Sequence, residues 1–271
     1  MALTLSSQVF GIVRQLVEEK AGLHYEPADL PLIESRLANR ALETGFDSLL
    51  DYYYYLRYDP EGPRELQNLV ESLVVHETYL FREPEALGVL VNDVVPELLR
   101  DRPRLRLWSA ACATGEEPYT VAMLLQAAGL LDRVDVVASD ISAPALARAR
   151  EGFYAGRALR ALPESSAARC LEPSGRGVRV PDSIRRRITW TRVNLVDRES
   201  VAAQGRFDVV LCRNVLIYFS DATVSAVAAS LADTITPGGV LLVGTSESLL
   251  RFGTSFVCEE RGGSFLYRAP S

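Results

Sequence analysis

The feature that most constrains this chain is a regular alternation of strand-like and helix-like segments after residue 104. Short apolar runs predict strands at 105–110, 134–139, 188–193 and 207–212, with further strands at 240–245 and near 264–268. Segments with helical spacing separate them, at 118–129, 143–151 and 221–236. This alternation predicts an α/β protein with a doubly wound, mostly parallel sheet that carries helices on both faces.

Two regions depart from the alternation. Residues 5–100 place apolar side chains at helical spacing, interrupted by Gly22, Gly45 and the run DPEGP, and predict a bundle of three or four helices followed by a helix at 84–100. The stretch 156–187 is rich in arginine, contains the turn-like SGRGV, and predicts a small antiparallel β insertion. We therefore expect a helical domain with its linker over 1–83, and a second domain over 84–271 that carries the insertion.

Composition excludes several classes of protein. Hydrophobic residues make up 48% and charged residues 24% of the chain, which are ordinary values for a globular protein. We expect no transmembrane segment, because no apolar run of roughly 18 residues is present, and the N-terminus lacks the pattern of a signal peptide; both point to the cytoplasm. The four cysteines form no CxxC pair and the chain has two histidines, so we expect free thiols and no metal site.

The net charge of −6 is unevenly distributed along the chain. Residues 1–100 have a balance of −9, whereas residues 148–198 have a balance of +7 that comes from arginine. A localised positive segment suggests an anionic partner on that part of the surface. Its triple arginine at 185–187 could also be an ordinary solvated face.

Polar residues follow the predicted strands at the edge where doubly wound sheets bind ligands. The loop ACATGEE follows the first strand, and its small residues let a ligand approach the backbone. Asp140 follows the second strand, and its carboxylate can accept hydrogen bonds from both hydroxyls of a ribose. The loop lacks the GxGxxG pattern, and Glu116 and Glu117 would repel a diphosphate but favour a cationic sulfonium. The pattern therefore favours S-adenosylmethionine over a dinucleotide.

Five ordered segments make the chain resemble the CheR family of chemotaxis-receptor methyltransferases. They are HETYLFRE at 76–83, LWSAACATGEEPYTVAM at 107–123, VVASDIS at 136–142, VVLCRNVLIYF at 209–219 and GGVLLVGTSESL at 238–249. The resemblance implies the class I S-adenosylmethionine-dependent methyltransferase fold. It also implies transfer of a methyl group to receptor glutamate carboxylates, which yields glutamate methyl esters and S-adenosylhomocysteine.

The expected partner is a methyl-accepting chemotaxis receptor or a related signalling protein. The arginine-rich segment 148–198 could dock it, because some members of the family bind a receptor tail on this subdomain. We expect a monomer that reaches the membrane only through its receptor and binds no nucleic acid.

The resemblance also assigns roles to individual residues. It implies that Thr78 and Arg82 close over the cofactor, that Glu116 lies near the methionine amino group, and that Asp140 holds the ribose. The other cofactor-binding residues that it implies are His76, Ala111, Arg213 and Asn214, with Asn194 and Leu195 beside the adenine.

The catalytic pair implied by the resemblance is Arg82 and Tyr218, which would lie beside the transferred methyl group. Two positions depart from the family pattern. His76 stands where the family usually has asparagine, which puts one cofactor contact in doubt, and Leu80 stands where it usually has a second phenylalanine.

Each of these residues also has an ordinary structural explanation when it is taken alone. Asp140 could cap the helix that follows, and Glu116 and Glu117 could be first-turn charges that the helix dipole favours. Tyr218 could be a core side chain and Arg82 a surface one. Two other functions stay open: a sensor that binds S-adenosylmethionine without transfer, and a nucleic-acid methyltransferase, against which the acidic charge and the lack of an NPPY-like run both count.

Overall fold

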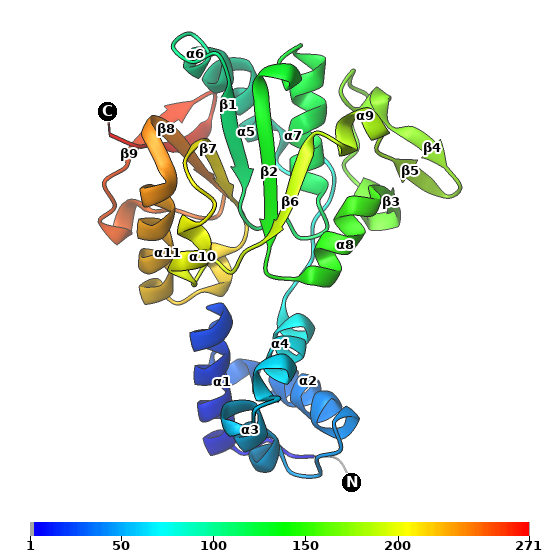
Figure 1. Ribbon diagram of the computed structural model, residues 1–271, viewed down its shortest axis with the longest axis vertical. Coiled ribbons are helices and arrows are strands. Elements are labelled where there is room, and N and C mark those ends of the chain that lie inside the picture. Colours follow the sequence, from blue (N-terminus) through cyan, green and yellow to red (C-terminus); the bar gives the residue numbers. More distant parts are fainter. Residues whose placement is uncertain (1–2, 271) are drawn as a thin grey trace. The chain divides into compact units, whose positions relative to one another are not determined.

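The computed structural model describes residues 3–270, which form two compact units (Figure 1). Within these described residues, the helical unit contains the chain up to Val75 together with Tyr218–Thr223, and the sheet unit contains His76–Ile217 and the chain from Val224 onward. The segment 76–83, expected as part of the helical domain, thus groups with the sheet unit. In the part of the chain described here, no helix is long and apolar enough to cross a membrane.

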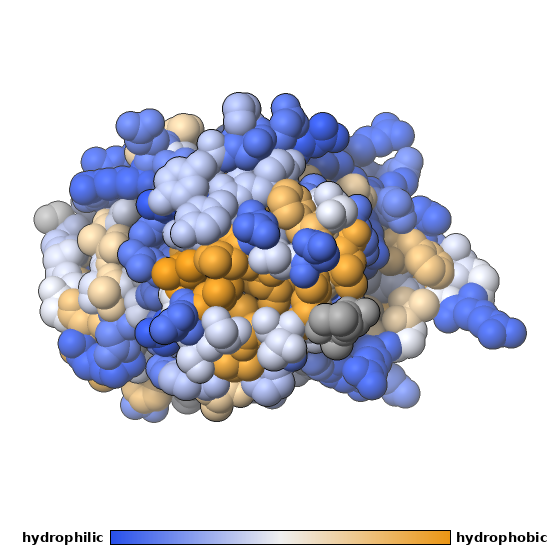
Figure 2. Space-filling model, turned by 90° about the horizontal axis from the view of Figure 1, so that it is seen from below, coloured by the Kyte–Doolittle hydropathy of each residue, from blue (hydrophilic) through white to orange (hydrophobic). Residues whose placement is uncertain are grey.

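The helical unit is a bundle, as the apolar spacing predicted. Its helices are α1 (Ser7–Ala21), α2 (Leu30–Glu43), α3 (Leu49–Tyr58) and α4 (Gly62–Leu73), with a 3-10 turn at Pro27–Asp29. Ser6 and Ser48 begin α1 and α3, because each hydroxyl accepts a hydrogen bond from a first-turn backbone N–H. Figure 2 shows apolar surface ringed by hydrophilic residues on the lower face of this unit. Its exposed large side chains include Leu32, Leu42, Leu50, Tyr54 and Tyr58.

Glu65 on α4 links three helices of the bundle. Its carboxylate accepts hydrogen bonds from the Tyr52 hydroxyl at 2.7 Å, the Asn68 amide at 2.9 Å, and Nε and Nη2 of Arg40 at 2.9 and 2.5 Å. Burial raises the pKa of Glu65, but the hydrogen bonds from these partners outweigh burial and leave the pKa below its ordinary value. The ionised carboxylate therefore stabilises this unit.

The stretch Tyr218–Thr223 completes the helical unit, although it lies far along the chain. Phe219 forms an antiparallel bridge with Leu23, just after the end of α1. The backbone carbonyl of Tyr218 accepts a hydrogen bond from the His24 N–H at 2.8 Å. The unit is therefore discontinuous in sequence.

The main sheet of the sheet unit has the strand order β6-β2-β1-β7-β8-β10-β9. The pairs β6–β2, β2–β1, β1–β7 and β7–β8 are parallel, whereas β10 runs antiparallel to β8 and β9. This arrangement confirms the expected doubly wound, mostly parallel sheet. The strand bounds are β1 Leu105–Ser109, β2 Val134–Asp140, β6 Ile188–Arg192, β7 Phe207–Cys212, β8 Ile235–Val243, β9 Val257–Arg261 and β10 Ser264–Arg268.

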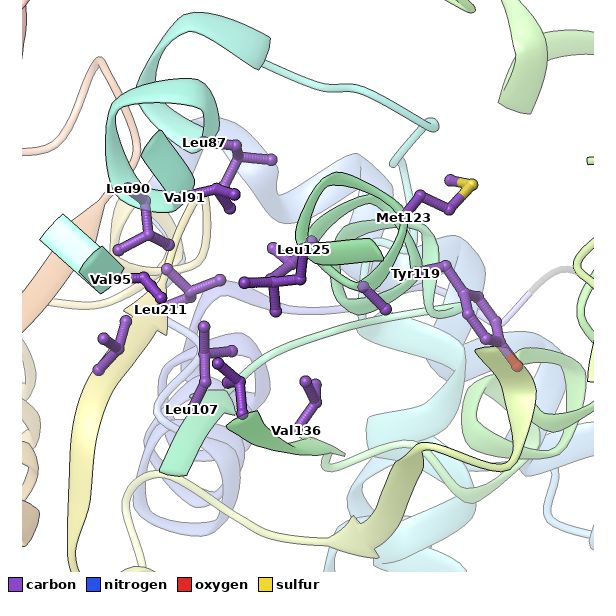
Figure 3. Close-up of a cluster of buried hydrophobic side chains, with 14 of the residues drawn as sticks. Leu87, Leu90, Val91, Val95, Leu107, Tyr119, Met123, Leu125, Val136 and Leu211 are labelled. Carbon is purple, nitrogen blue, oxygen red and sulfur yellow. The ribbon is translucent and has the colours of Figure 1, made fainter. Parts of the chain in front are cut away.

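Helices pack against this sheet and bury its apolar strands. In Figure 3, Leu107, Val136 and Leu211 of three neighbouring strands point toward Leu125 of α7 and toward the helical segment that carries Val91. The helices are α5 Pro84–Val89, α6 Val95–Leu98, α7 Glu116–Ala127, α8 Ala143–Glu151, α9 Asp182–Arg185, α10 Arg198–Ala202 and α11 Asp221–Thr234, with a π-helical turn at Leu90–Val94 between α5 and α6. The 3-10 turns are Leu131–Arg133, Gly156–Leu159, Ala168–Cys170, Leu216–Tyr218 and Leu250–Phe252.

The small antiparallel sheet that the stretch 156–187 predicted is present, but its first strand lies just before that stretch. Its strands are β3 (Phe153–Ala155), β4 (Glu172–Ser174) and β5 (Gly177–Arg179), in the order β3-β5-β4, and the SGRGV run makes the turn between β4 and β5. Two strand predictions were incomplete elsewhere. β8 begins at Ile235, inside the helix expected to reach 236, and β9 was not expected.

Candidate functional site

The candidate site lies where β1, β2 and β7 end side by side. The loop after β1 stays attached to both neighbouring strands, since Ala110 N–H donates to the Leu211 carbonyl at 2.8 Å and Cys112 N–H donates to the Ser139 carbonyl at 2.9 Å. The strand order reverses between β1 and β7. That reversal is the place where open parallel sheets bind ligands at their carboxyl edge.

Asp140, at the end of β2, shapes the loop beside it. Its Oδ2 accepts a hydrogen bond from the Ala113 N–H at 2.8 Å, and its Oδ1 accepts one from the Ser142 N–H at 2.9 Å. Ser142, and not Asp140, caps α8, because the Ser142 hydroxyl accepts from the Ala145 N–H.

Gly115 makes the close approach between this loop and the rest of the sheet unit. Its φ is 91°, and a Cβ atom there would lie 2.7 Å from Ala149 Cβ and 2.9 Å from the Trp190 ring. The preceding Thr114 carbonyl accepts a hydrogen bond from the buried Tyr154 hydroxyl at 2.7 Å. Only glycine fits this backbone conformation and this spacing without strain.

Glu116 and Glu117 begin α7 but lie in different surroundings. Glu116 is 3% exposed, and its Oε2 accepts a hydrogen bond from the Thr114 hydroxyl at 2.7 Å. Burial raises the pKa of Glu116 above its ordinary value. Glu117 instead accepts hydrogen bonds from Ser109 at 2.7 Å and from Arg213 at 2.8 Å. The helix was expected to begin at residue 118, and a first-turn position was only the structural alternative for these two glutamates; α7 in fact begins at Glu116. The difference between their surroundings could not be read from their positions in the sequence.

Arg213, directly after β7, is an interior residue whose side chain is 1% exposed. Its guanidinium pairs with Glu83 at 2.9 Å and with Glu117 at 2.8 Å. Burial opposes the charge of Arg213, but the two carboxylates outweigh burial and raise its pKa. Arg213 was expected in the cofactor pocket, and Glu83 was not singled out from the sequence.

Asn214 has a left-handed backbone conformation, with φ 57°. Glu247 holds this turn, since its carboxylate accepts 2.7 Å hydrogen bonds from the N–H groups of Asn214, Leu216 and Gly244. Sequence reasoning missed Glu247 as a residue that shapes the site, although it lies in the quoted segment GGVLLVGTSESL.

Asn194 and Leu195 follow β6 and are tied to the same strand end. Val193 N–H donates to the backbone carbonyl of Asp140 at 3.1 Å, and Leu195 is buried. Ala111 is half-buried in the loop after β1. These expected cofactor residues therefore share one edge of the sheet with Asp140.

The segment 76–83 carries His76, Thr78 and Arg82. The Nε2 atom of His76 is buried and has no hydrogen-bond partner among the described residues. Arg82 is 28% exposed at its side chain, and its Nη1 donates to the Glu77 carbonyl at 3.1 Å. These residues belong to the sheet unit, whereas Tyr218 belongs to the helical unit, so the expected catalytic pair does not lie within one unit.

Comparison with known proteins identifies the family. The model of the CheR methyltransferase S-adenosylmethionine-binding domain matches residues 76–261, and the model of the CheR methyltransferase all-alpha domain matches residues 8–74. The chain belongs to the CheR methyltransferase family. The class I methyltransferase fold expected from the resemblance is thus confirmed, and the CheR domain of this chain binds S-adenosylmethionine.

Curated relatives of this CheR family member match it over most of its length. Chemotaxis protein methyltransferase 2 of Vibrio cholerae is 36% identical over 90% of this chain and 86% of its own. The chemotaxis protein methyltransferase of Vibrio parahaemolyticus is 34% identical over 98% of both chains. Chemotaxis protein methyltransferase Cher2 of Pseudomonas putida is 35% identical over 87% of this chain and 88% of its own.

Several atoms of the CheR site suit this cofactor. The buried Arg213 Nε, like His76 Nε2, has no hydrogen-bond partner among the described residues, so both nitrogens can bond to a ligand. The buried Glu116 carboxylate suits a cationic amine, which would offset the cost of its burial. All three residues were predicted from the sequence to contact the cofactor.

Proposed function

We propose that this chain transfers the methyl group of S-adenosylmethionine to glutamate side-chain carboxylates of chemotaxis receptors. The observation that carries this proposal is the near end-to-end match to relatives named chemotaxis protein methyltransferases, at 34% identity over 98% of both chains in one case. The cytoplasmic location expected from the sequence stays a prediction, as do the monomeric state and the lack of nucleic-acid binding.

The methyl transfer requires little acid–base catalysis from the protein. S-adenosylmethionine supplies a methyl group activated by its sulfonium charge, and the sulfur leaves as the neutral thioether of S-adenosylhomocysteine. A glutamate carboxylate is already ionised near pH 7, so its oxygen can attack without a general base. The protein therefore needs to align the carboxylate with the methyl group and to exclude water, which are contributions of position rather than of proton transfer.

Cofactor binding is assigned to the residues at the sheet edge. The Asp140 carboxylate would accept hydrogen bonds from the ribose hydroxyls, and the Glu116 carboxylate would accept from the methionine ammonium. Arg213 Nε and His76 Nε2 would bond to polar atoms of the cofactor, since both are buried and without a partner among the described residues. Ala111, Thr78 and Asn214 would line the pocket, with Asn194 and Leu195 at the adenine.

The catalytic roles are assigned to Arg82 and Tyr218. The planar guanidinium of Arg82 can hold both oxygens of the incoming carboxylate, and its side chain is open enough to be reached. The Tyr218 hydroxyl would help to fix the other carboxylate oxygen or the sulfonium end. We expect Tyr218→Phe and Arg82→Lys to lower single-turnover transfer at saturating cofactor. Tyr218→Phe removes only the hydroxyl, and Arg82→Lys keeps the positive charge but loses the planar guanidinium. Wild-type rates in both variants would remove these two roles.

Receptor docking is assigned to the arginine-rich insertion. Its triple arginine is largely engaged within the chain, because Arg185 and Arg186 pair with Asp182, and Arg187 pairs with Asp132. Other arginines of the insertion are exposed and better suited to an acidic partner: Arg157, Arg169 and Arg176. We therefore place the docking surface on these exposed arginines within the segment 148–198.

The experiment that tests the function uses labelled S-adenosylmethionine and membranes that contain candidate receptors. The proposal predicts base-labile methyl esters on receptor glutamates. A protein that binds the cofactor, measured by calorimetry, but labels no receptor would instead be the sensor that the sequence left open. Label on nucleic acid with none on receptors would support the other alternative.

A further inference from the structure

The turn that carries Arg82 has an unusual backbone. Phe81 and Glu83, on either side of Arg82, both adopt the left-handed conformation, with φ of 59° and 52°. Neither residue is glycine, so both conformations are strained by contact between Cβ and the backbone. Strained residues of this kind persist where the surrounding structure holds them, and they cluster at functional sites.

The N-terminal side of the turn is fastened to α7 and to the insertion. Phe81 N–H donates to the Thr120 hydroxyl oxygen at 3.0 Å, and that hydroxyl donates to the Glu116 carbonyl at 2.7 Å. Leu80 N–H donates to the Ala158 carbonyl at 2.9 Å. The Leu80 and Phe81 side chains are both buried, so these hydrogen bonds are shielded from water.

The C-terminal side of the turn is held by Arg213. Its Nη2 donates to the Arg82 carbonyl at 3.0 Å and to Glu83 Oε2 at 2.9 Å, while its Nη1 donates to Glu117 Oε2 at 2.8 Å. The Asn214 amide donates to Glu83 Oε1 at 3.0 Å. We call Arg213, Glu83, Glu117 and Asn214 the Arg213 clamp.

Glu83 uses both carboxylate oxygens in this clamp, and its Oε1 also lies 3.9 Å from Nε of Arg82 itself. Besides Arg213 and Asn214, the Thr245 N–H donates to its Oε2 at 3.1 Å. Burial raises the pKa of Glu83, but the hydrogen bond from Asn214 and the charge of Arg213 outweigh burial and lower the pKa. A buried ion pair of this kind is weak evidence for a gain in stability, because desolvation offsets the attraction. Its position beside a strained turn points to another use.

We propose that the Arg213 clamp is a positioning device that holds the strained turn so that the Arg82 guanidinium is presented to the substrate carboxylate in one place. Glu83, Glu117 and Thr120 are then positioning residues, which act through Arg82 and do not touch the reacting atoms. This proposal rests on the proposed function of Arg82.

The first test replaces Glu83 by glutamine. Glutamine keeps the shape of Glu83, but its NH2 group faces donors where an oxygen accepted, so the clamp is broken. We expect single-turnover methyl transfer at saturating cofactor to fall by about 10–100-fold, since a displacement near 1 Å can cost that much. Because Glu83 also holds Arg213 and Asn214, which are assigned to the cofactor pocket, calorimetry first establishes the S-adenosylmethionine concentration that saturates the variant. Glu85→Gln is the matched control, since Glu85 is exposed two residues further along, and it should behave as wild type.

The second test measures the turn itself, without any substrate. Hydrogen exchange of the backbone amides in 76–83 should be faster in cofactor-free Glu83→Gln than in wild type, and unchanged in Glu85→Gln. Exchange that is equally slow in all three proteins overturns the clamp. This readout does not depend on the reaction, so it separates failure of the clamp from failure of the proposed function.

A double-mutant cycle decides whether the clamp works through Arg82. In an Arg82→Ala background, Glu83→Gln should lower transfer by less than about twofold. If it lowers transfer by the same factor in both backgrounds, the positioning role is wrong. Arg82→Ala at the wild-type rate would overturn the role of Arg82, whatever the exchange data show.

A variant on the other side of the turn covers the case in which Glu83→Gln does not fold. Thr120→Val removes the oxygen that accepts from Phe81 N–H, and it should reproduce the slow transfer and the fast exchange. Thr120→Ser restores the hydroxyl and should rescue both. Equal behaviour of the valine and serine variants would contradict the proposal.

Discussion

Replacing Glu116 by glutamine should make the cofactor-free protein more stable and make it bind the cofactor less tightly. Glu116 is 3% exposed, and burial raises its pKa even though it stands at the N-terminus of α7, where the helix dipole favours an anion. The ionised form of the Glu116 carboxylate therefore costs free energy in the folded, cofactor-free protein. Glutamine keeps the oxygen that accepts from the Thr114 hydroxyl and removes the charge.

The expected magnitudes follow from these contacts. Removing an unfavourable buried charge should stabilise the free protein by about 0.5–2 kcal/mol, the range common to single stabilising substitutions. That corresponds to a rise in Tm of about 1–8 °C for a unit of roughly 150–250 residues. Loss of a charged hydrogen bond to the methionine ammonium costs about 1.5–3 kcal/mol, which weakens S-adenosylmethionine binding by about 10–100-fold.

The neighbouring Glu117→Gln is the matched control and should shift Tm in the opposite direction. Glu117 pairs with buried Arg213 and accepts from Ser109, so its neutralisation leaves a buried guanidinium short of a partner. Calorimetric scans and titrations of the three proteins at pH 7 measure both effects. A lower Tm for Glu116→Gln would refute the burial argument, and an unchanged affinity would remove Glu116 from the cofactor site.

The same reasoning predicts how the gain from Glu116→Gln depends on pH. A carboxyl group whose pKa is raised on folding contributes stability below its unfolded pKa and loses that contribution as pH rises through the folded pKa. The difference in Tm between Glu116→Gln and wild type should therefore be largest near neutral pH, shrink as pH falls through the raised folded pKa, and lose its charge contribution below about 4.3, the ordinary value for glutamate. A difference that is constant with pH would mean that charge is not its cause.

Three further predictions concern other parts of the chain. Asp140→Ala should weaken S-adenosylmethionine binding by about 1–3 kcal/mol and also lower Tm, since its carboxylate holds Ala113 and Ser142; calorimetry that finds unchanged affinity removes Asp140 from the site. Glu65 has a lowered folded pKa, so its contribution is present above its unfolded pKa and lost as pH falls through the folded value; in urea unfolding, the stability gap between wild type and Glu65→Gln should narrow below about pH 4.3. Neutralising the exposed arginines Arg157, Arg169 and Arg176 should slow receptor methylation more at low salt than at high salt. Equal losses at both salt concentrations would argue against electrostatic docking.

The alternation of strands and helices was predictable because buried parallel strands are continuous apolar runs. The run from Phe207 to Cys212 is buried throughout, and its boundaries are those that the sequence predicted. β9 was missed because its side chains are largely half-buried or exposed and include three charged residues, so the segment lacks an apolar pattern. An edge strand of this kind is defined by its pairing with β10 rather than by its own composition.

The positions of the expected cofactor residues along the sheet edge were predictable for the same reason, since strand ends follow from strand positions. The role of Arg213 was not. An arginine after a strand is ordinarily a polar contact at the surface, and its partner Glu83 lies 130 residues earlier in the chain. Left-handed backbone at Phe81, Glu83 and Ala113 was also hidden, because such conformations ordinarily signal glycine.

The discontinuity of the helical unit bears on how this protein can be divided in the laboratory and in evolution. A recombinant fragment that stops at Val75 would lack the strand partner of Leu23 and the carbonyl that accepts from His24. The complementary fragment would keep Phe219 but lose what it pairs with. The helical unit therefore cannot be exchanged between relatives by a single crossover in the sequence. A working chimaera must take Tyr218–Thr223 from the same parent as the N-terminal helices.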